Sequence, residues 1–232
     1  MDHFRPVRGL GLAASVLIGL IAIGQIADVL TSWHSYTVVR DYLDGVAGVT
    51  TADLTSADEY TAIVSIPLTV LHIAAGVVFI VWLYRARLNA ERVTYAAEHR
   101  RGKGWAIGSW FTPVVNFWFP KQIIDDVWRA SDPMQQQVPL QQRQKSALVT
   151  VWWIAFLVMQ AIDRIIMRIY LRQEISPPML FDAAVASTAS AFFTVVAAVL
   201  AAQIVQRISD FQTVPFTPPP ASVPAHDYRG YN

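Results

Sequence analysis

The sequence predicts an all-α membrane protein built as a bundle of four transmembrane helices. Two observations lead to this fold class. Of the 232 residues, 54% are hydrophobic and only 15% are charged, a balance too apolar for an ordinary soluble domain. Four windows also reach the length of about 20 mainly apolar residues that a membrane-spanning helix needs. These predicted spans lie at about 9–30, 63–83, 147–166 and 183–204.

The chain divides into a membrane domain and a tail. Residues 1–210 form the predicted membrane domain, and 211–232 are rich in proline, which predicts a disordered tail. The first span follows a basic start and resembles a signal peptide. Its apolar stretch is longer than a signal core, so we interpret it as an uncleaved anchor. Cysteine is absent, which excludes disulfides and thiolate metal sites.

The distribution of basic residues predicts the orientation. Ten Lys and Arg residues lie between Tyr84 and Ser146, whereas Arg40 stands alone among five acidic residues between Thr31 and Ala62. Because Lys and Arg in short loops stay on the cytoplasmic side, both termini are expected in the cytoplasm. The lipid bilayer is the expected environment. A net charge of +1 gives no indication of a nucleic-acid partner.

An aromatic segment, 104–130, separates the second and third spans. Its first part offers about 15 apolar residues, too few for a full crossing, and Gly108 and Pro113 interrupt it. We therefore expect a re-entrant or interfacial segment on the cytoplasmic side. Asn116 is expected to hydrogen-bond groups left open in the turn, with ligand binding as the alternative. The candidate residues of this interfacial motif are Trp105, Trp110, Phe111, Pro113, Asn116, Trp118, Pro120, Asp125, Asp126 and Trp128.

The end of this segment predicts an amphipathic interfacial helix that begins near Pro120, which suits a first helical turn. Apolar residues follow the spacing of one helix face, and polar residues occupy the other. We expect the polar face to be solvated. Two i,i+4 ion pairs are predicted on it, Lys121 with Asp125 and Asp125 with Arg129.

Two stretches, VWLYRARLNAE and GWAIGSWFTPVVNFWFPKQIIDDVWRASDP, together resemble the actinobacterial membrane proteins grouped as domain-of-unknown-function family 4328. The matching core runs from about Ile80 to Pro133. The pattern Trp-Phe-x-Pro-x-x-Asn, with a later Pro and an Asp-x-x-Trp-like end, makes the resemblance specific. It implies a multi-span bacterial membrane protein of undetermined activity, and it implies no catalytic residues.

Ionisable residues inside the spans predict an intramembrane polar cluster, because a charge at that depth is costly and usually functional. Gln25 and Asp28 share a face of the first span, and Gln160, Asp163 and Arg164 lie close together on the third. A rise of about 1.5 Å per residue puts the two groups at a similar depth. We expect Arg164 to pair with one of the two aspartates, and a proton or ion relay is the alternative.

His72 stands near the middle of the second span, after Pro67. A haem would need a second axial ligand at the same depth, but His34 lies at the outer end of the first span. We therefore expect no haem or other cofactor. The simpler interpretation is a buried His72 bonded to a carbonyl that Pro67 leaves free.

The motifs favour a protein that acts by contacts. The chain has no Gly-rich phosphate loop, nucleophile elbow or HExxH motif. We expect a non-enzymatic scaffold or regulatory protein that binds a membrane-protein partner or a second copy, and no bound metal. One alternative is a small transporter or an ion- or proton-conducting protein that uses Asp28, Asp163 and Arg164. The other is a lipid-modifying enzyme with a metal at Asp125, Asp126 and Asn116.

Overall fold

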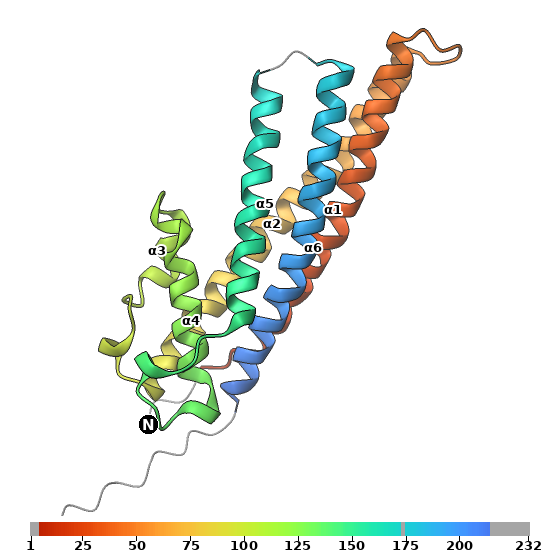
Figure 1. The fold of residues 1–232 in the computed structure, drawn as a ribbon. Helices are drawn as coiled ribbons and strands as arrows, with labels where there is room; N and C mark the ends of the chain where they lie inside the picture. Colours follow the sequence, from red (N-terminus) through yellow and green to blue (C-terminus); the bar gives the residue numbers. More distant parts are fainter. Residues whose placement is uncertain (1–4, 173–174, 214–232) are drawn as a thin grey trace, which may run out of the picture.

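The computed structural model describes residues 5–172 and 175–213, and the regular secondary structure of these residues is entirely helical. Four long helices form an elongated bundle (Figure 1). They are α1 (Arg8–Leu43), α2 (Thr51–Val93), α5 (Ala147–Arg172) and α6 (Pro177–Phe211). Each is long and apolar enough to cross a membrane, which confirms the predicted four-helix architecture. The predicted disordered tail lies, apart from its first three residues, outside the described residues.

The long helices extend well beyond the apolar windows. Helix α1 has 36 residues, a length of about 54 Å, whereas the hydrocarbon core of a bilayer is about 30 Å thick. Most of the loop expected between the first two spans is therefore helical, since polar residues end an apolar window without ending a helix. The actual connection is short, and Gly45 and Gly48 have positive φ angles of 68° and 91°. Helix α2 then begins where the Thr50 backbone N–H donates to the Asp53 carboxylate (2.7 Å).

Helix α1 lies at the centre of the packing. It contacts α2 on one side and α6 on the other, and α5 packs on α6. Small residues permit the close approach of α1 and α6, because Gly11 and Ser15 on α1 are buried, as are Ser190 and Thr194 on α6. These small residues face one another inside the bundle, whereas Gly19 of α1 is exposed.

A basal layer, which we define as residues 94–146, closes one end of the bundle (Figure 1). This basal end is where α1 begins and α6 ends, and the opposite end is called distal. Helix α4 (Phe119–Ser131) packs against α2, α5 and α6, and the short α3 (Trp105–Phe111) lies beside it. The 3-10 turns of the layer are η1 (Ala96–Glu98), η2 (Val115–Phe117), η3 (Pro133–Gln135) and η4 (Leu140–Gln142).

Candidate functional site

A cavity of about 290 Å³ lies among the spans above the basal layer. Every long helix contributes to its wall, and α3 contributes Trp110. The lining residues are Ile18, Ile21, His72, Ala75, Gly76, Phe79, Ile80, Trp110, Trp152, Phe156, Met159, Thr194, Ala197, Ala198 and Ala201. This wall is almost entirely apolar. Such a cavity between the helices of a bundle has the usual composition of a ligand site.

Aromatic rings form the basal end of the cavity. The Trp110 ring meets Phe79 edge to face, with 5.6 Å between the ring centroids, and it meets Phe156 in the same way at 6.2 Å. Trp152 and Phe156 stack on each other at 5.9 Å. The Trp110 indole nitrogen is buried and has no hydrogen-bond partner among the described residues. Trp110 therefore connects the predicted interfacial motif to the cavity wall and carries an unused hydrogen-bond donor.

The intramembrane polar cluster lies beyond the distal end of the same cavity, and His72 is the member of the cluster that lines it. Asp28 lies within electrostatic range of both Asp163 and His72, which places these residues of α1, α5 and α2 at one depth, as predicted for the two aspartates. Gln25 donates to the Asp28 carboxylate (3.4 Å), and the Ser190 hydroxyl donates to Asp163 (2.6 Å). The cluster thus brings together side chains from all four long helices. The Gln160 side chain forms no hydrogen bond with any described residue.

The predicted pairing of Arg164 with an aspartate is wrong. Its guanidinium lies over the Phe117 ring, 5.2 Å from the ring centroid, and it forms no ion pair within the described part of the chain. Adjacent residues on a helix point about 100° apart, so Asp163 can face the bundle while Arg164 faces the aromatic segment. The polar cluster consequently contains carboxylates without a fixed basic partner.

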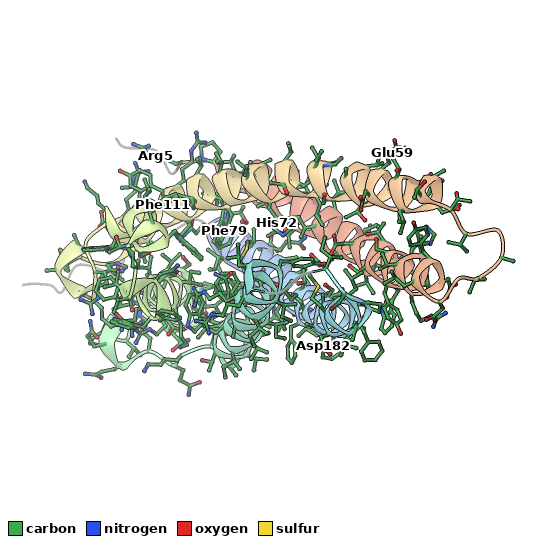
Figure 2. The ribbon with its side chains drawn as sticks, turned by 90° about the horizontal axis from the view of Figure 1, so that it is seen from above. Arg5, Glu59, His72, Phe79, Phe111 and Asp182 are labelled. Carbon is green, nitrogen blue, oxygen red and sulfur yellow. The ribbon has the colours of Figure 1, made fainter. Side chains whose placement is uncertain are left out.

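The expectation for His72 is also wrong in its details. The His72 Nδ1 atom lies 2.9 Å from the Leu68 carbonyl oxygen. Pro67 does not free this carbonyl, because a proline removes the helical hydrogen bond to the carbonyl four positions before it. A carbonyl can only accept, so Nδ1 carries a proton. His72 lines the cavity instead of being buried in the helix packing. Figure 2 shows His72 and Phe79 on the side of α2 that faces the other helices, while Glu59 points away.

The turn of the aromatic segment closes without the Asn116 side chain. Val114 adopts a positive φ of 70°, and backbone bonds follow from Phe117 N to Val114 O and from Trp118 N to Val115 O. Asn116 Oδ1 is buried and has no hydrogen-bond partner among the described residues. The predicted structural bond of Asn116 is therefore wrong, because the turn satisfies its own backbone groups.

The remaining residues of the interfacial motif divide between an exposed tip and a base in which Pro120 and Trp128 are buried while Trp105 and Trp118 stay partly exposed. Phe111 and Val114 are 72% and 63% exposed at the tip that surrounds Pro113. The Trp153 indole of α5 holds this tip by donating to the Phe117 carbonyl (3.0 Å). At the base, Trp105 and Trp118 both pack edge to face on Phe119, Pro120 is buried, and Trp128 packs on Phe211.

The helix predicted to begin near Pro120 is present as α4, but its polar face is not solvated. Asp125 and Asp126 are each 1% exposed, and Arg129 is 2% exposed. The chain before α3 covers this face, because Arg100 donates to Asp126 through its backbone N–H (3.0 Å) and through its side chain (2.9 Å). Arg143 covers it from the other side and donates to the Arg129 carbonyl (2.9 Å). The periodicity of a helix identifies its polar face and contains no information on what packs against that face.

One of the two predicted ion pairs on α4 is present. Lys121 Nζ lies 2.9 Å from the Asp125 carboxylate, as predicted. Arg129 instead pairs with Asp126, at 2.6 Å and one residue closer in sequence than predicted. Both aspartates are thus engaged by basic side chains. This arrangement gives no support to the metal-binding alternative at these positions.

His99 is buried in the same layer, and sequence reasoning missed it. Its Nε2–H donates to the Thr94 hydroxyl (2.8 Å), because that hydroxyl already donates to the Ala90 carbonyl (3.0 Å). The Nδ1 atom has no hydrogen-bond partner among the described residues. Burial, together with the positive charge of Arg87, lowers the pKa of His99 to about 4. The imidazole is therefore neutral at ordinary pH.

The free energy of unfolding is expected to fall as the pH drops from 6.5 to about 4. Between these pH values, unfolded His99 binds a proton and folded His99 does not. The stabilisation from neutral His99 is therefore complete above the unfolded pKa, and it disappears as the pH falls toward the folded pKa. The loss amounts to about 3 kcal/mol. Thermal unfolding in detergent micelles over this range should show a steeper pH dependence for wild type than for His99→Gln. Equal slopes in the two proteins would contradict the prediction.

The fold and the cavity together define a class: a helical membrane-type bundle with an apolar internal site and a folded basal layer. The chain belongs to the family described as Domain of unknown function (DUF4328), whose sequence model matches residues 46–210. This match contains the aromatic segment, α4 and most of the cavity wall. No curated protein matches the chain, and no solved structure matches it.

Proposed function

We propose that the protein is a non-enzymatic regulatory protein of the bacterial cytoplasmic membrane that acts by binding an apolar ligand between its spans. The cavity of about 290 Å³ is the observation that carries this proposal. Its apolar wall suits a hydrocarbon or aromatic group, because burying apolar surface is the main gain available there. In the basal layer, Asp125 and Asp126 are already paired with basic side chains, which favours ligand binding over catalysis.

The proposal places the basal layer on the cytoplasmic side and both termini with it. This orientation is supported by the ten basic residues between Tyr84 and Ser146. The exposed tip at Phe111 and Val114 then dips into the inner leaflet, where exposed apolar side chains are stable. A membrane-protein partner or a second copy would meet the protein in this region, and ligand occupancy would be transmitted to it through Trp110.

A cavity-filling variant tests the proposed site. A side chain at Gly76 enters open space, since a Cβ built there has no atom within 4 Å, and Gly76 lines the cavity. Gly76→Leu is therefore expected to reduce the affinity for a neutral phenylalkane by about tenfold or more by occupying its volume. The measurement is scintillation-proximity binding of the radiolabelled phenylalkane to the full chain in nanodiscs, with empty nanodiscs subtracted.

Gly19→Leu is the matched control. Gly19 also has open space around its Cβ position, but it lies outside the cavity wall. The affinity of Gly19→Leu for the phenylalkane should equal that of wild type. If the phenylalkane binds Gly76→Leu as tightly as it binds Gly19→Leu, the cavity is not the binding site.

A small transporter or an ion- or proton-conducting protein is the second candidate. The meeting of Asp28, His72 and Asp163 from three helices favours it. The apolar wall between this cluster and the basal layer weighs against it, because a conducted ion would need polar groups along its path. Proton flux into liposomes that contain the protein, compared with Asp163→Asn, separates the two candidates.

A further inference from the structure

The distal end of the cavity carries an unbalanced charge. His72 lines the cavity itself, and Asp163 lies one helical turn beyond the lining residue Met159. Ser190, which donates to Asp163, lies one turn beyond the lining residue Thr194. A helical turn rises about 5.4 Å. The carboxylate is therefore within reach of the polar end of a molecule that fills the cavity.

The groups that face this end come from all four long helices. Helix α1 contributes Asp28, α2 contributes His72, and α6 contributes the Ser190 hydroxyl. Helix α5 contributes Asp163. Tyr170, further toward the distal end of α5, lies within electrostatic range of Asp28. Neither aspartate forms an ion pair with any described residue.

Asp28 is partly buried and Asp163 is exposed on the surface of the bundle. Two neighbouring carboxylates repel each other, so both are stabilised by a positive charge placed between them. Arg164 does not supply this charge, because it lies over the Phe117 ring. His72 lies within electrostatic range of Asp28 and can offset one of the two carboxylates. A bound ligand or a proton is left to supply the second positive charge.

The other end of the cavity selects the rest of the ligand. Phe79, Trp110, Trp152 and Phe156 form an aromatic wall that suits an apolar or aromatic body. Aromatic faces also attract an organic cation through the ring quadrupole. The two ends together match an amphiphile with one positively charged end.

We propose that the ligand of this cavity is a small hydrophobic organic cation, whose charged nitrogen lies at Asp28 and Asp163 and whose apolar body fills the aromatic end. This inference rests on the proposed function and specifies the class of its ligand. Protons compete with the cation for the two carboxylates. Acidification is therefore expected to release the cation and to leave a neutral ligand bound.

The test compares two probes that differ only in charge. One is phenylbutyl-trimethylammonium, and the other is its neutral isostere, with carbon in place of the quaternary nitrogen. Binding to the full chain in nanodiscs is measured for both, with empty nanodiscs subtracted. Wild type is expected to bind the cation at least about tenfold more tightly than the isostere, because two neighbouring carboxylates attract a positive charge and give no such attraction to a neutral group.

Variants locate the source of this preference. Asp28→Asn with Asp163→Asn should abolish the preference and leave the affinity for the isostere unchanged, since asparagine can still accept the bonds from Gln25 and Ser190. Asp182→Asn is the matched control on α6, since Asp182 is exposed outside the cluster, and should behave as wild type. Lowering the pH should weaken binding of the cation alone, a readout that does not depend on the variants folding.

The outcomes separate the two proposals. Equal affinities for the two probes in wild type, or a preference that survives in the double variant, would overturn the cation proposal and leave the apolar site standing. Binding of neither probe would overturn both.

Discussion

Replacing Asp126 with alanine is expected to destabilise the protein by about 3–5 kcal/mol, the usual result of removing one partner from a buried ion pair. Asp126 pairs with Arg129 at 2.6 Å and with Arg100 at 2.8 Å, and it also accepts the Arg100 backbone N–H. Without it, Arg129 would remain buried with an uncompensated charge. Thermal unfolding in detergent, followed by circular dichroism, should show a large fall in Tm.

The control for this prediction is Asp58→Asn, which removes an exposed acidic side chain from α2. That change should leave the Tm close to the wild-type value, because exposed charges contribute little. If Asp126→Ala unfolds at the same temperature as Asp58→Asn, the buried network does not stabilise the basal layer.

Introducing a side chain at Gly11 is expected to push α1 away from α6. A Cβ at this position would lie 2.6 Å from Ser209 Oγ and 3.2 Å from Val205 Cγ1. Ser209 cannot easily move away, because its hydroxyl accepts from the Trp82 indole (3.0 Å) and donates to the Val205 carbonyl (2.7 Å). Gly11→Val should therefore lower the free energy of unfolding by about 3 kcal/mol through overpacking.

Gly19→Val offers a matched comparison on the same helix. No atom lies within 4 Å of a Cβ built at Gly19, so the substitution should change stability by well under about 1 kcal/mol. Both variants are measured by unfolding in the same detergent. Similar losses at the two positions would mean that the contact of α1 with α6 is not the reason for the effect.

The four long apolar helices could be predicted because they depend on local composition. An apolar run of about 20 residues has few stable conformations outside a membrane helix, whatever its neighbours are. The helix ends could not be predicted in the same way. Helix α2 begins at the Thr50–Asp53 contact, well before the apolar window at 63. A hydrogen bond stabilises the beginning of α2, and a hydropathy profile does not report hydrogen bonds.

The candidate site was predicted only in part, and the reason is geometric. Asp28 and Asp163 could be placed at one depth from sequence, because helical rise is constant. Arg164 could not be placed, since its direction depends on how α5 is rotated against α6 and the aromatic segment. The cavity had no sequence signal, because Gly76 and Phe79 line a cavity only when α5 and α6 lie opposite them.

The sequence by itself determined the helical class, the four long apolar helices and the polar face of α4, since these follow from composition and helical period. Tertiary structure alone decided that this polar face is buried beneath Arg100 and Arg143, that Arg164 leaves the polar cluster, and that an aromatic cavity lies below it. Those features depend on contacts between residues distant in the chain, and a helix of given sequence accepts more than one set of neighbours.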